Sequence, residues 1–282
     1  MTGTRPPDVI GLGCRRCATS WLHECLNRHP QIGKPRRGLH FFSEHHGNGS
    51  EWYLDRLREY ADRPVLMEFS VSYSYPEYCE EAARRIHDMV PHAKLFISIR
   101  NPIERAFSDY LRSVRMLETG ADVPFEDAIR TSPVLLERGL YARIIARYLD
   151  LFPKEQLLVL LYDDLKADPA GFVGRLLEFI GVEPHVPLPE TPASGGTVRW
   201  PLYNRLVFSA KKTADCVARG LGLAAPWERF KSKRRTAYVK VLNANVVETE
   251  MASQTRADLC AYYEKDIARL EQLTGRDLTH WK

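Results

Sequence analysis

The stretch GLGCRRCATSWL, residues 11–22, holds two cysteines three positions apart, two arginines between them and a Thr-Ser pair after them. A redox CxxC pair needs its first cysteine exposed at a helix start, where the helix dipole stabilises a thiolate. Cys14 is instead expected at the end of a buried strand. A zinc site needs a second pair of ligands at comparable spacing, and the sequence has none. Neither cysteine chemistry fits the stretch.

A loop that binds an anion fits the same residues better. The backbone N–H groups of residues 16–20 would lie at a helix start, with arginines beside them and the hydroxyls of Thr19 and Ser20 as further donors. The nucleoside triphosphatase pattern GxxxxGK[ST] is different, and no Gly-Lys-Ser/Thr occurs in the chain. The residues therefore favour an anion site and disfavour a kinase.

A second candidate phosphate site lies in SIRNPIERAFSDYLRS, residues 98–113. Arg100 ends an apolar run that reads as a strand, and Ser108 lies eight residues later in a helical stretch. An arginine fork and a hydroxyl on a helix can hold a dianionic phosphate together.

Continuous apolar runs alternate with amphipathic stretches along the first two thirds of the chain. The predicted strands are residues 8–14, 65–70, 94–100 and 156–165. The predicted helices are residues 21–30, stopped near Pro30, and residues 80–90, 103–117 and 170–180. Buried strands that alternate with helices favour a parallel sheet of four or five strands with helices on both faces.

We predict one domain over residues 1–282, without a linker that would divide it. Residues 8–190 form its α/β core, 191–250 a Gly/Pro/Ser-rich loop and a basic helical stretch, and 251–282 a final helix and tail.

The composition is that of a soluble globular protein, with 44% apolar residues, 27% charged residues and a net charge of +4. This charge suits an anionic ligand but is too small to indicate nucleic acid. The sequence shows neither a signal-peptide pattern nor an apolar run long enough for a membrane span, so we expect a cytoplasmic protein whose six cysteines are reduced. The basic segment 229–240 reads as a solvated face, with contact to anionic lipid as the open alternative. The oligomeric state is not predicted.

Residues 15–22 resemble the 5′-phosphosulfate loop of sulfotransferases that use 3′-phosphoadenosine-5′-phosphosulfate (PAPS). In the family's order, Arg16 stands at a lysine, Cys17 at a small residue and Ala18 at a glycine, followed by the hydroxyl pair. The element around Arg100 resembles the family's 3′-phosphate site. Further segments that match in order are HFF (40–42), EWYLDRL (51–57), GLYARIIARYLDLFP (139–153), LLYDDLKADP (160–169) and SGGTVR (194–199). The likeness covers nearly the whole chain and is greatest to the heparan-sulfate-type Golgi branch and its bacterial relatives.

The resemblance implies a P-loop-like three-layer α/β fold and an enzyme that moves a sulfonate group from PAPS to a hydroxyl or amine. The acceptor would be a carbohydrate, a glycolipid or a small metabolite, the product nucleotide would be 3′-phosphoadenosine-5′-phosphate (PAP), and no metal would be needed. The implied donor-binding residues are Arg15, Arg16, Cys17, Ala18, Thr19, Ser20, Arg100, Ser108, Thr197 and Arg199. The implied catalytic residues are Arg16, His40 and Glu68.

The catalytic base is the main departure from the family. Heparan-type relatives carry a glutamate two residues before the histidine of HFF, where this chain has Gly38. His40 remains, and an imidazole with a pKa near 6.5 can take an alcohol proton at neutral pH. Glu68 is the other candidate, and Phe69 after it replaces a lysine that is common in relatives. The sequence leaves the choice between His40 and Glu68 open.

These departures, together with Arg16 and Ala18, leave a second function open. The chain could be an impaired family member that binds a nucleotide or a glycan without transferring sulfonate. A P-loop nucleotide kinase is a third and less favoured alternative.

Overall fold

The computed structural model describes residues 5–35, 37–115, 119, 123–190 and 250–282, together with 197–198, 209, 213–214, 220 and 246–247. The chain divides into two compact units. The first consists of residues 1–106, 134–193 and 256–282, and the second of 107–133 and 194–255. The single domain expected from the sequence stays a prediction, and each unit is described by itself.

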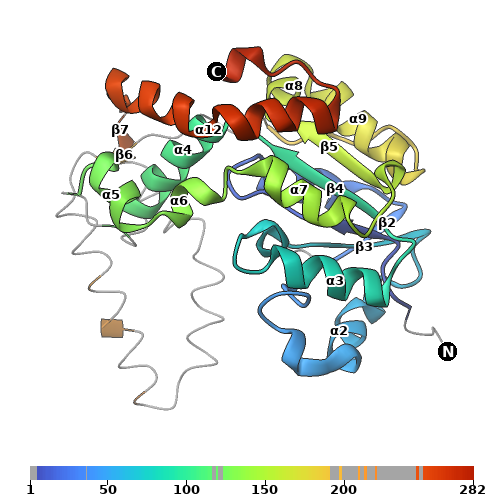
Figure 1. The fold of residues 1–282 in the computed structure, drawn as a ribbon. Helices are drawn as coiled ribbons and strands as arrows, with labels where there is room; N and C mark the ends of the chain where they lie inside the picture. Colours follow the sequence, from blue (N-terminus) through green and yellow to red (C-terminus); the bar gives the residue numbers. More distant parts are fainter. Residues whose placement is uncertain are drawn as a thin grey trace. The chain divides into compact units, whose positions relative to one another are not determined.

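The first unit contains a sheet of five strands in the order β2-β3-β1-β4-β5, and every neighbouring pair is parallel. Its strands are β1 (Val9–Gly11), β2 (Ile32–Gly33), β3 (Val65–Phe69), β4 (Lys94–Ile99) and β5 (Leu157–Leu161). The central strands are buried along nearly their whole length, which explains their continuous apolar runs. The predicted parallel sheet is therefore confirmed (Figure 1).

Three strand predictions need correction. The strand expected over residues 8–14 covers only Val9–Gly11, so Cys14 lies in the loop after it and not at the end of the strand. The strand expected over residues 156–165 ends at Leu161, because α8 (Tyr162–Ala167) begins directly after it. Asp163 and Asp164 lie in the first turn of that helix, where acidic side chains are favoured by the helix dipole. The sequence pattern also missed β2, which has only two residues and pairs with β3 at the sheet edge.

Helices cover both faces of the sheet. Besides α8, the helices with residues in the first unit are α1 (Thr19–Arg28), α2 (Gly49–Leu57), α3 (Cys79–Met89), α4 (Pro102–Arg115), α6 (Val134–Glu137), α7 (Tyr141–Leu149), α9 (Pro169–Ile180) and α12 (Ser253–Thr274), of which α4 continues into the second unit and α12 begins in it. On one face, α1 and α9 share a core with the sheet that includes Leu22, Phe96 and Leu176. Figure 1 shows α3 and α7 side by side in front of the other face. The three-layer α/β arrangement is thus as expected.

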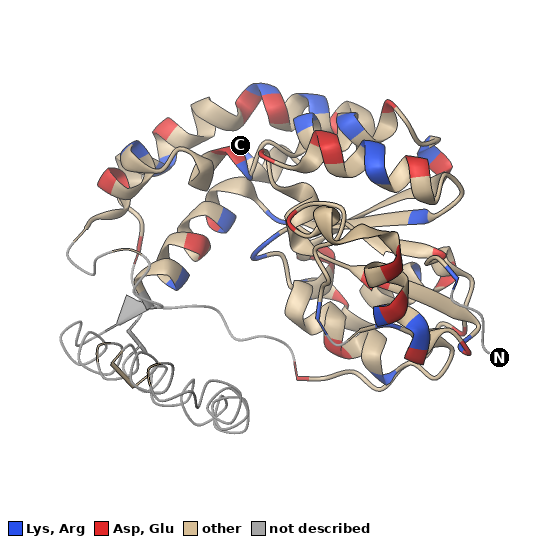
Figure 2. Cartoon of the chain, turned by 90° about the horizontal axis from the view of Figure 1, so that it is seen from below, with Lys and Arg blue, Asp and Glu red and all other residues tan. Residues whose placement is uncertain are grey.

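The exposed faces of the described helices carry charges of both signs (Figure 2). On α3, Glu81 accepts from Arg84 at 2.8 Å and from Arg85 at 3.0 Å. On α5 (Phe125–Thr131), Arg130 pairs with Asp127 at 2.8 Å. Such exposed pairs contribute little to stability, and they give these faces mixed charge.

The second unit holds the later part of α4 together with α5. The Phe107 ring meets the Phe125 ring edge-on, with 5.2 Å between centroids. Two short strands, β6 (Thr197–Val198) and β7 (Val246–Val247), pair antiparallel. The basic segment 229–240 lies outside the described residues.

Candidate functional site

The candidate residues of the first unit follow the carboxyl ends of its central strands. The loop 12–18 follows β1, Arg100 follows β4 and Tyr162 follows β5. In open parallel α/β sheets, ligands bind at this edge. The topology therefore brings the arginine-bearing loop and Arg100 to one edge, although 84 residues of sequence separate Arg16 from Arg100.

The loop before α1 has an unusual backbone. Arg16 has φ 70° and Ala18 has φ 60°, so both lie in the left-handed region that L-residues seldom adopt. Ala18 is the N-cap of α1, and its carbonyl accepts the first helical hydrogen bond from Leu22 N–H at 3.0 Å. Such alternation of backbone conformation turns successive N–H groups toward one point.

The N–H groups of this loop are available. Within the described part of the chain, nothing accepts a hydrogen bond from the N–H groups of residues 18–21. No side chain caps the helix either, and Thr19 is half-buried while Ser20 is exposed. The helix dipole adds positive potential at the same place. Arg15 and Arg16 are partly exposed beside it, so the loop forms a site for an anion.

Both cysteines of the loop are buried and free. Cys14 is 2% exposed and Cys17 is not exposed. Burial in a medium of low polarity raises the pKa of the Cys17 thiol to about 11, and it raises the pKa of Cys14 further. Neither thiol is a redox nucleophile, and the described residues hold no cluster of three or more metal-binding side chains.

The conformation of Ala18 leads to a stability prediction. A Cβ atom at positive φ costs roughly 1–2 kcal/mol, which glycine avoids. We expect Ala18→Gly to raise the free energy of unfolding by about 1 kcal/mol, after its larger chain entropy is counted. Urea denaturation followed by circular dichroism measures the change.

The matched control for Ala18 is Ala146→Gly, because Ala146 lies inside α7 with helical backbone. That change should lower the free energy of unfolding by about 1 kcal/mol. Equal losses at both positions would show that residue 18 does not store strain.

Arg100 stands directly after β4 with its guanidinium facing the edge of the sheet. Its Cζ lies 4.9 Å from the centroid of the Tyr162 ring, a cation–π contact. Its Nη2 is 3.7 Å from Glu104 Oε2, and its buried Nε hydrogen-bonds to no described residue. Asn101 then caps α4, because its Oδ1 accepts from Ile103 N–H at 3.0 Å. Arg100 therefore keeps donors for a further anion.

The remaining predicted phosphate ligands belong to the second unit. Ser108 is 8% exposed on α4, in the turn after Arg105. Thr197 is part of β6, and Arg199 lies outside the described residues. Their assignment to the donor stays a prediction.

His40 is the half-buried histidine of the loop that precedes α2. Its backbone lies at φ 53°, and its N–H donates to Ser70 Oγ at 2.8 Å. Its Nδ1 is 2.7 Å from Ser72 Oγ, and Ser72 Oγ is 2.6 Å from Ser43 Oγ. The loop is thus bound to the segment after β3, and the ring is fixed by a chain of two hydroxyls.

The hydroxyl chain favours one tautomer of His40. When Ser43 Oγ donates its one proton to the carbonyl of His40 at 3.2 Å, it accepts from Ser72 at 2.6 Å. Ser72 then accepts from Nδ1–H of His40. This leaves the lone pair on Nε2, and no described residue hydrogen-bonds to Nε2. Burial lowers the pKa of His40, which keeps the ring neutral at pH 7 and ready to accept a proton.

Glu68 lies on β3 and has no exposed surface. Its Oε1 accepts from Leu39 N–H at 3.0 Å and from the Ser70 hydroxyl. Burial raises the pKa of Glu68, while the hydrogen bonds and the nearby Lys34 charge act in the opposite direction. The carboxyl group fixes the residue before His40, because Leu39 N–H donates to it and to no other group of the described chain.

Gly38 has no room for a side chain. A Cβ atom there would lie 2.5 Å from Ser70 Oγ and 2.7 Å from the Phe69 carbonyl oxygen. The close approach of this loop to the end of β3 therefore requires glycine.

The missing glutamate can consequently not be restored at position 38. We expect Gly38→Glu to lower the free energy of unfolding by roughly 1–3 kcal/mol through overpacking, without raising the transfer rate. Gly38→Ala should destabilise similarly, whereas Gly47→Ala should be neutral, because a Cβ at Gly47 meets nothing within 4 Å. Thermal melting and initial rates test this. A faster Gly38→Glu enzyme with an unchanged melting temperature would contradict it.

Lys34, which no sequence pattern singles out, is buried next to this region at 3% exposure. Its Nζ contacts His23 Nδ1 at 3.0 Å, Asn27 Oδ1 at 3.2 Å and the Pro35 carbonyl at 2.8 Å. Burial lowers its pKa to about 8. The His23 ring in turn stacks on Phe69, with 4.2 Å between centroids. A lysine in a polar loop gives no sequence signal for such burial.

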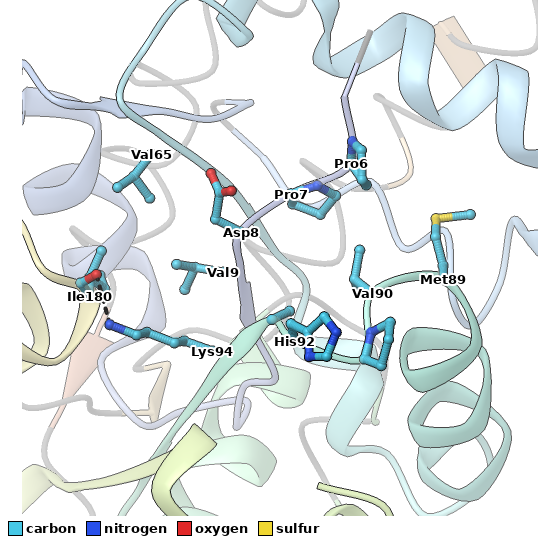
Figure 3. Close-up of a pocket in the computed structure, with 12 residues that line it drawn as sticks. Pro6, Pro7, Asp8, Val9, Val65, Met89, Val90, His92, Lys94 and Ile180 are labelled. Atoms are coloured by element: carbon cyan, nitrogen blue, oxygen red, sulfur yellow. Dashed lines mark hydrogen bonds between the residues drawn. The ribbon is translucent and has the colours of Figure 1, made fainter. Parts of the chain in front are cut away.

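A cavity of about 400 Å³ lies at the opposite, amino-terminal edge of the sheet (Figure 3). Prolines and aliphatic side chains line most of it. Its Lys94 already donates to the carbonyls of Phe179 and Ile180 at 2.7 and 3.1 Å, and Asp8 accepts from Leu66 N–H at 2.7 Å. The two charged side chains that line this cavity are thus occupied by the protein itself, which argues against an anion site here.

A model of the sulfotransferase domain family matches residues 6–220. Mouse heparan sulfate glucosamine 3-O-sulfotransferase 6 is 28% identical over 279 residues, which cover 97% of this chain and 73% of that protein. Human heparan sulfate glucosamine 3-O-sulfotransferase 3B1 is 27% identical over 281 residues, covering 96% and 64% of the two chains.

The crystal structure of a sulfotransferase from Alicyclobacillus acidocaldarius superposes with a TM-score of 0.67 and 26% identity, covering 98% of this chain and 99% of that one. The fold is therefore the P-loop-like α/β fold of these enzymes. Because the family model also spans well over half of the sequence, this chain belongs to the sulfotransferase family.

Proposed function

We propose that this enzyme transfers a sulfonate group from PAPS to a hydroxyl or amine of an acceptor and releases PAP. The observation that carries the proposal is the loop before α1, where the N–H groups of residues 18–21 lack acceptors on the described chain beside Arg16. An anion with several oxygens is the ligand that such a loop accepts. Membership of the sulfotransferase family makes phosphosulfate the expected anion.

The donor is held at two points in this proposal. Within the predicted loop 16–20, the amides of Ala18, Thr19 and Ser20 hold the 5′-phosphosulfate together with the Thr19 and Ser20 hydroxyls and the Arg15 and Arg16 side chains. The Cys17 N–H instead donates to the Cys14 carbonyl at 3.3 Å. Arg100 holds the 3′-phosphate with Ser108, Thr197 and Arg199. The arginines and amides supply the positive field at the leaving phosphate, so that no metal is needed.

His40 is the proposed base. Nε2 takes the proton of the acceptor hydroxyl, whose oxygen attacks sulfur in line as the bond from sulfur to the 5′-phosphate oxygen breaks. The electron pair of that bond goes to the phosphate, and Arg16 stabilises the charge that develops there. Glu68 is fully buried, so we assign it a positioning role: it holds Leu39 N–H and thereby the loop that carries His40.

For the acceptor we favour the hydroxyl of a carbohydrate over the amine of a small metabolite. The support is the likeness to proteins named for heparan sulfate glucosamine, at 27–28% identity. A glycolipid acceptor is compatible with contact between the basic segment 229–240 and anionic lipid. Among the described helices, none is both long and apolar enough to cross a bilayer.

We also propose a cytoplasmic location. Its support is that Cys14, Cys17, Cys25 and Cys79 are buried free thiols, as expected of a protein kept under reducing conditions.

A thermal-shift experiment with PAP, ATP with magnesium, and buffer alone tests the donor assignment. PAP is expected to raise the melting temperature by several degrees at saturating concentration, because ligands that bind only the folded state stabilise it. Stabilisation by ATP with magnesium but not by PAP would instead favour the nucleotide kinase.

A further inference from the structure

The segment 275–282, after α12, carries a tryptophan that is almost completely buried. Gly275 ends the helix at φ 69°, and the chain then turns back toward the sheet. Trp281 is 1% exposed and Leu278 is not exposed. An aromatic residue this deep, outside the regular helices of the core, requires a reason.

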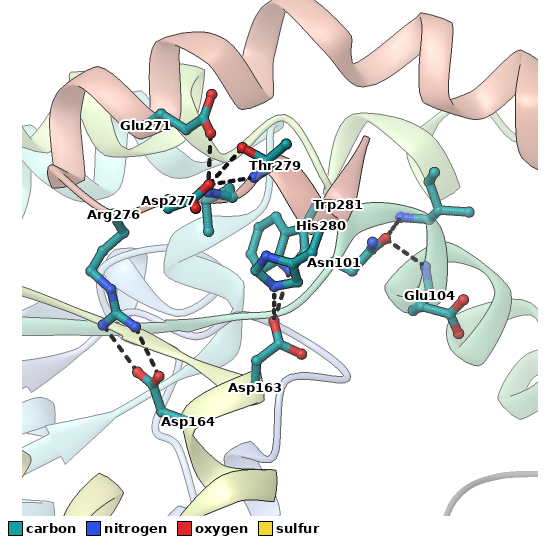
Figure 4. Close-up of polar contacts among 12 residues, drawn as sticks. Asn101, Glu104, Asp163, Asp164, Glu271, Arg276, Asp277, Thr279, His280 and Trp281 are labelled. Carbon is teal, nitrogen blue, oxygen red and sulfur yellow. Dashed lines mark hydrogen bonds and ion pairs between the residues drawn. The ribbon is translucent and has the colours of Figure 1, made fainter.

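Trp281 first contacts Asp163, in the first turn of α8, close to the end of β5. Its Nε1 donates to Asp163 Oδ2 at 2.7 Å, and His280 Nε2 lies 3.3 Å from the same oxygen (Figure 4). Asp163 follows Tyr162, whose ring supports the Arg100 guanidinium at 4.9 Å. Because Ile99 pairs with Leu161 in the sheet, Arg100 and Tyr162 leave their strands at the same level.

Trp281 is also linked to the loop that carries Arg16, because Tyr141 lies between them and contacts both. Its ring packs against the Tyr141 ring, with 6.5 Å between centroids and an angle of 61°. The Tyr141 hydroxyl is 3.8 Å from Cys17 Sγ, and Cys17 stands between the two residues at positive φ, Arg16 and Ala18. The Cys17 carbonyl is held as well, by the Ser98 hydroxyl at 2.7 Å.

Tyr141 is fixed from the side of α12 too. Asp266 accepts from Ala142 N–H at 3.0 Å and from Arg143 N–H at 3.3 Å, so it caps the start of α7. Tyr263 donates to the Leu136 carbonyl at 2.7 Å just before that helix. The helix and the segment after it therefore determine together where the Tyr141 hydroxyl lies.

We infer that Trp281 is a positioning residue of the donor site. It joins the support of Arg100, through Asp163 and Tyr162, to the support of the Arg16 loop, through Tyr141 and Cys17. Residues held at positive φ keep that conformation only where their surroundings impose it, and Tyr141 is part of those surroundings. The inference rests on the proposed function, because it assigns Arg100 and Arg16 to one donor molecule.

Two variants of Trp281 separate its hydrogen bond to Asp163 from its ring contact with Tyr141. Trp281→Phe keeps an aromatic ring against Tyr141 but removes the Nε1 donor to Asp163. Trp281→Ala removes both. We expect Trp281→Ala to bind PAP about tenfold more weakly by calorimetry and to raise the KM for PAPS to a similar extent, with a much smaller change in kcat. Trp281→Phe should fall between Trp281→Ala and the unchanged protein.

Two controls distinguish positioning from loss of stability. Lys282→Ala alters the same segment but only removes a bond to Glu271 Oε2 at 2.6 Å. Ile180→Ala, at the opposite edge of the sheet, removes buried volume and should lower the melting temperature comparably. Neither control should weaken PAP binding.

Unchanged PAP affinity in both Trp281 variants would overturn the inference, as would an equal loss of affinity in Ile180→Ala. If Trp281→Ala does not fold, Trp281→Phe decides through its own PAP affinity. A different result, no PAP binding by the unchanged protein, would refute the proposed donor rather than the role of Trp281.

Discussion

Arg16→Ala is expected to lower kcat about 100- to 1000-fold, with a smaller effect on the binding of PAP. The leaving phosphate gains charge as the bond to sulfur breaks, and a cation beside it stabilises that state more than the ground state. Loss of one such group at a comparable anionic transition state costs this much in other enzymes. The amides of residues 18–21 remain in the variant and keep much of the affinity for the product.

Arg16→Lys separates charge from geometry. A lysine supplies a compact charge, whereas arginine supplies a planar fork. Lysine is also the residue that the sulfotransferase pattern has at this position. A kcat above that of the unchanged enzyme would show that arginine slows transfer here. Arg28→Ala is the matched control, since Arg28 lies at the far end of α1 and pairs with Glu24 at 2.5 Å. Loss of PAP binding without loss of kcat at saturating PAPS would contradict the role of Arg16.

His40→Asn is expected to reduce kcat about 1000-fold, within the range for loss of a general base. Asparagine is chosen because it tolerates the left-handed backbone at residue 40, which has φ 53°. The exposed neighbour gives the control: His45→Asn should retain nearly full activity.

The pH profile tests the same assignment without a substitution. The base must be neutral, so kcat/KM should fall as the pH drops through the pKa of His40. Burial lowers that pKa, so the fall should be centred below pH 6.5. Ser72→Ala removes the acceptor of Nδ1–H, and it should lower kcat about tenfold by freeing the tautomer. An acid limb that persists in His40→Asn would assign the base to another group.

The central strands and the loop between β1 and α1 could be predicted from sequence because both depend on local patterns. Apolar runs such as KLFISI mark strands that are buried on both faces, and a loop between strand and helix follows from the change of period. The loop's chemistry was also local, since Arg16, Thr19 and Ser20 are neighbours. The end of β5 was misjudged, because the helix begins within the same apolar run, and the two-residue β2 gave too short a pattern to be recognised.

What could not be predicted depends on contacts between distant segments. The positive φ of Ala18 is imposed by packing around the loop, and alanine by itself would indicate a helical residue. The burial of Lys34 and the hydroxyl chain at His40 arise where the loop 34–43 meets the end of β3. The tryptophan near the end of the sequence carried no signal for its contacts with Asp163 and Tyr141.

The contacts of Gly38 and Phe69 bear on whether the enzyme is impaired. The sequence alone reads Gly38 and Phe69 as lost functional groups. The structure shows that Gly38 is required by close backbone contact and that Phe69 stacks on His23, so both are integral to the fold. The neutral imidazole of His40 is then the group that we propose as base.

Release of PAP from PAPS, followed by mass spectrometry together with the sulfonated product across a panel of carbohydrate acceptors, tests the central claim most directly. We predict PAP release that requires an acceptor, matches the sulfonated product mole for mole, and falls at least 100-fold in Arg16→Ala. PAP binding without any acceptor-dependent release, equal in the unchanged protein and in Arg16→Ala, would contradict the account and identify a nucleotide-binding protein without transferase activity.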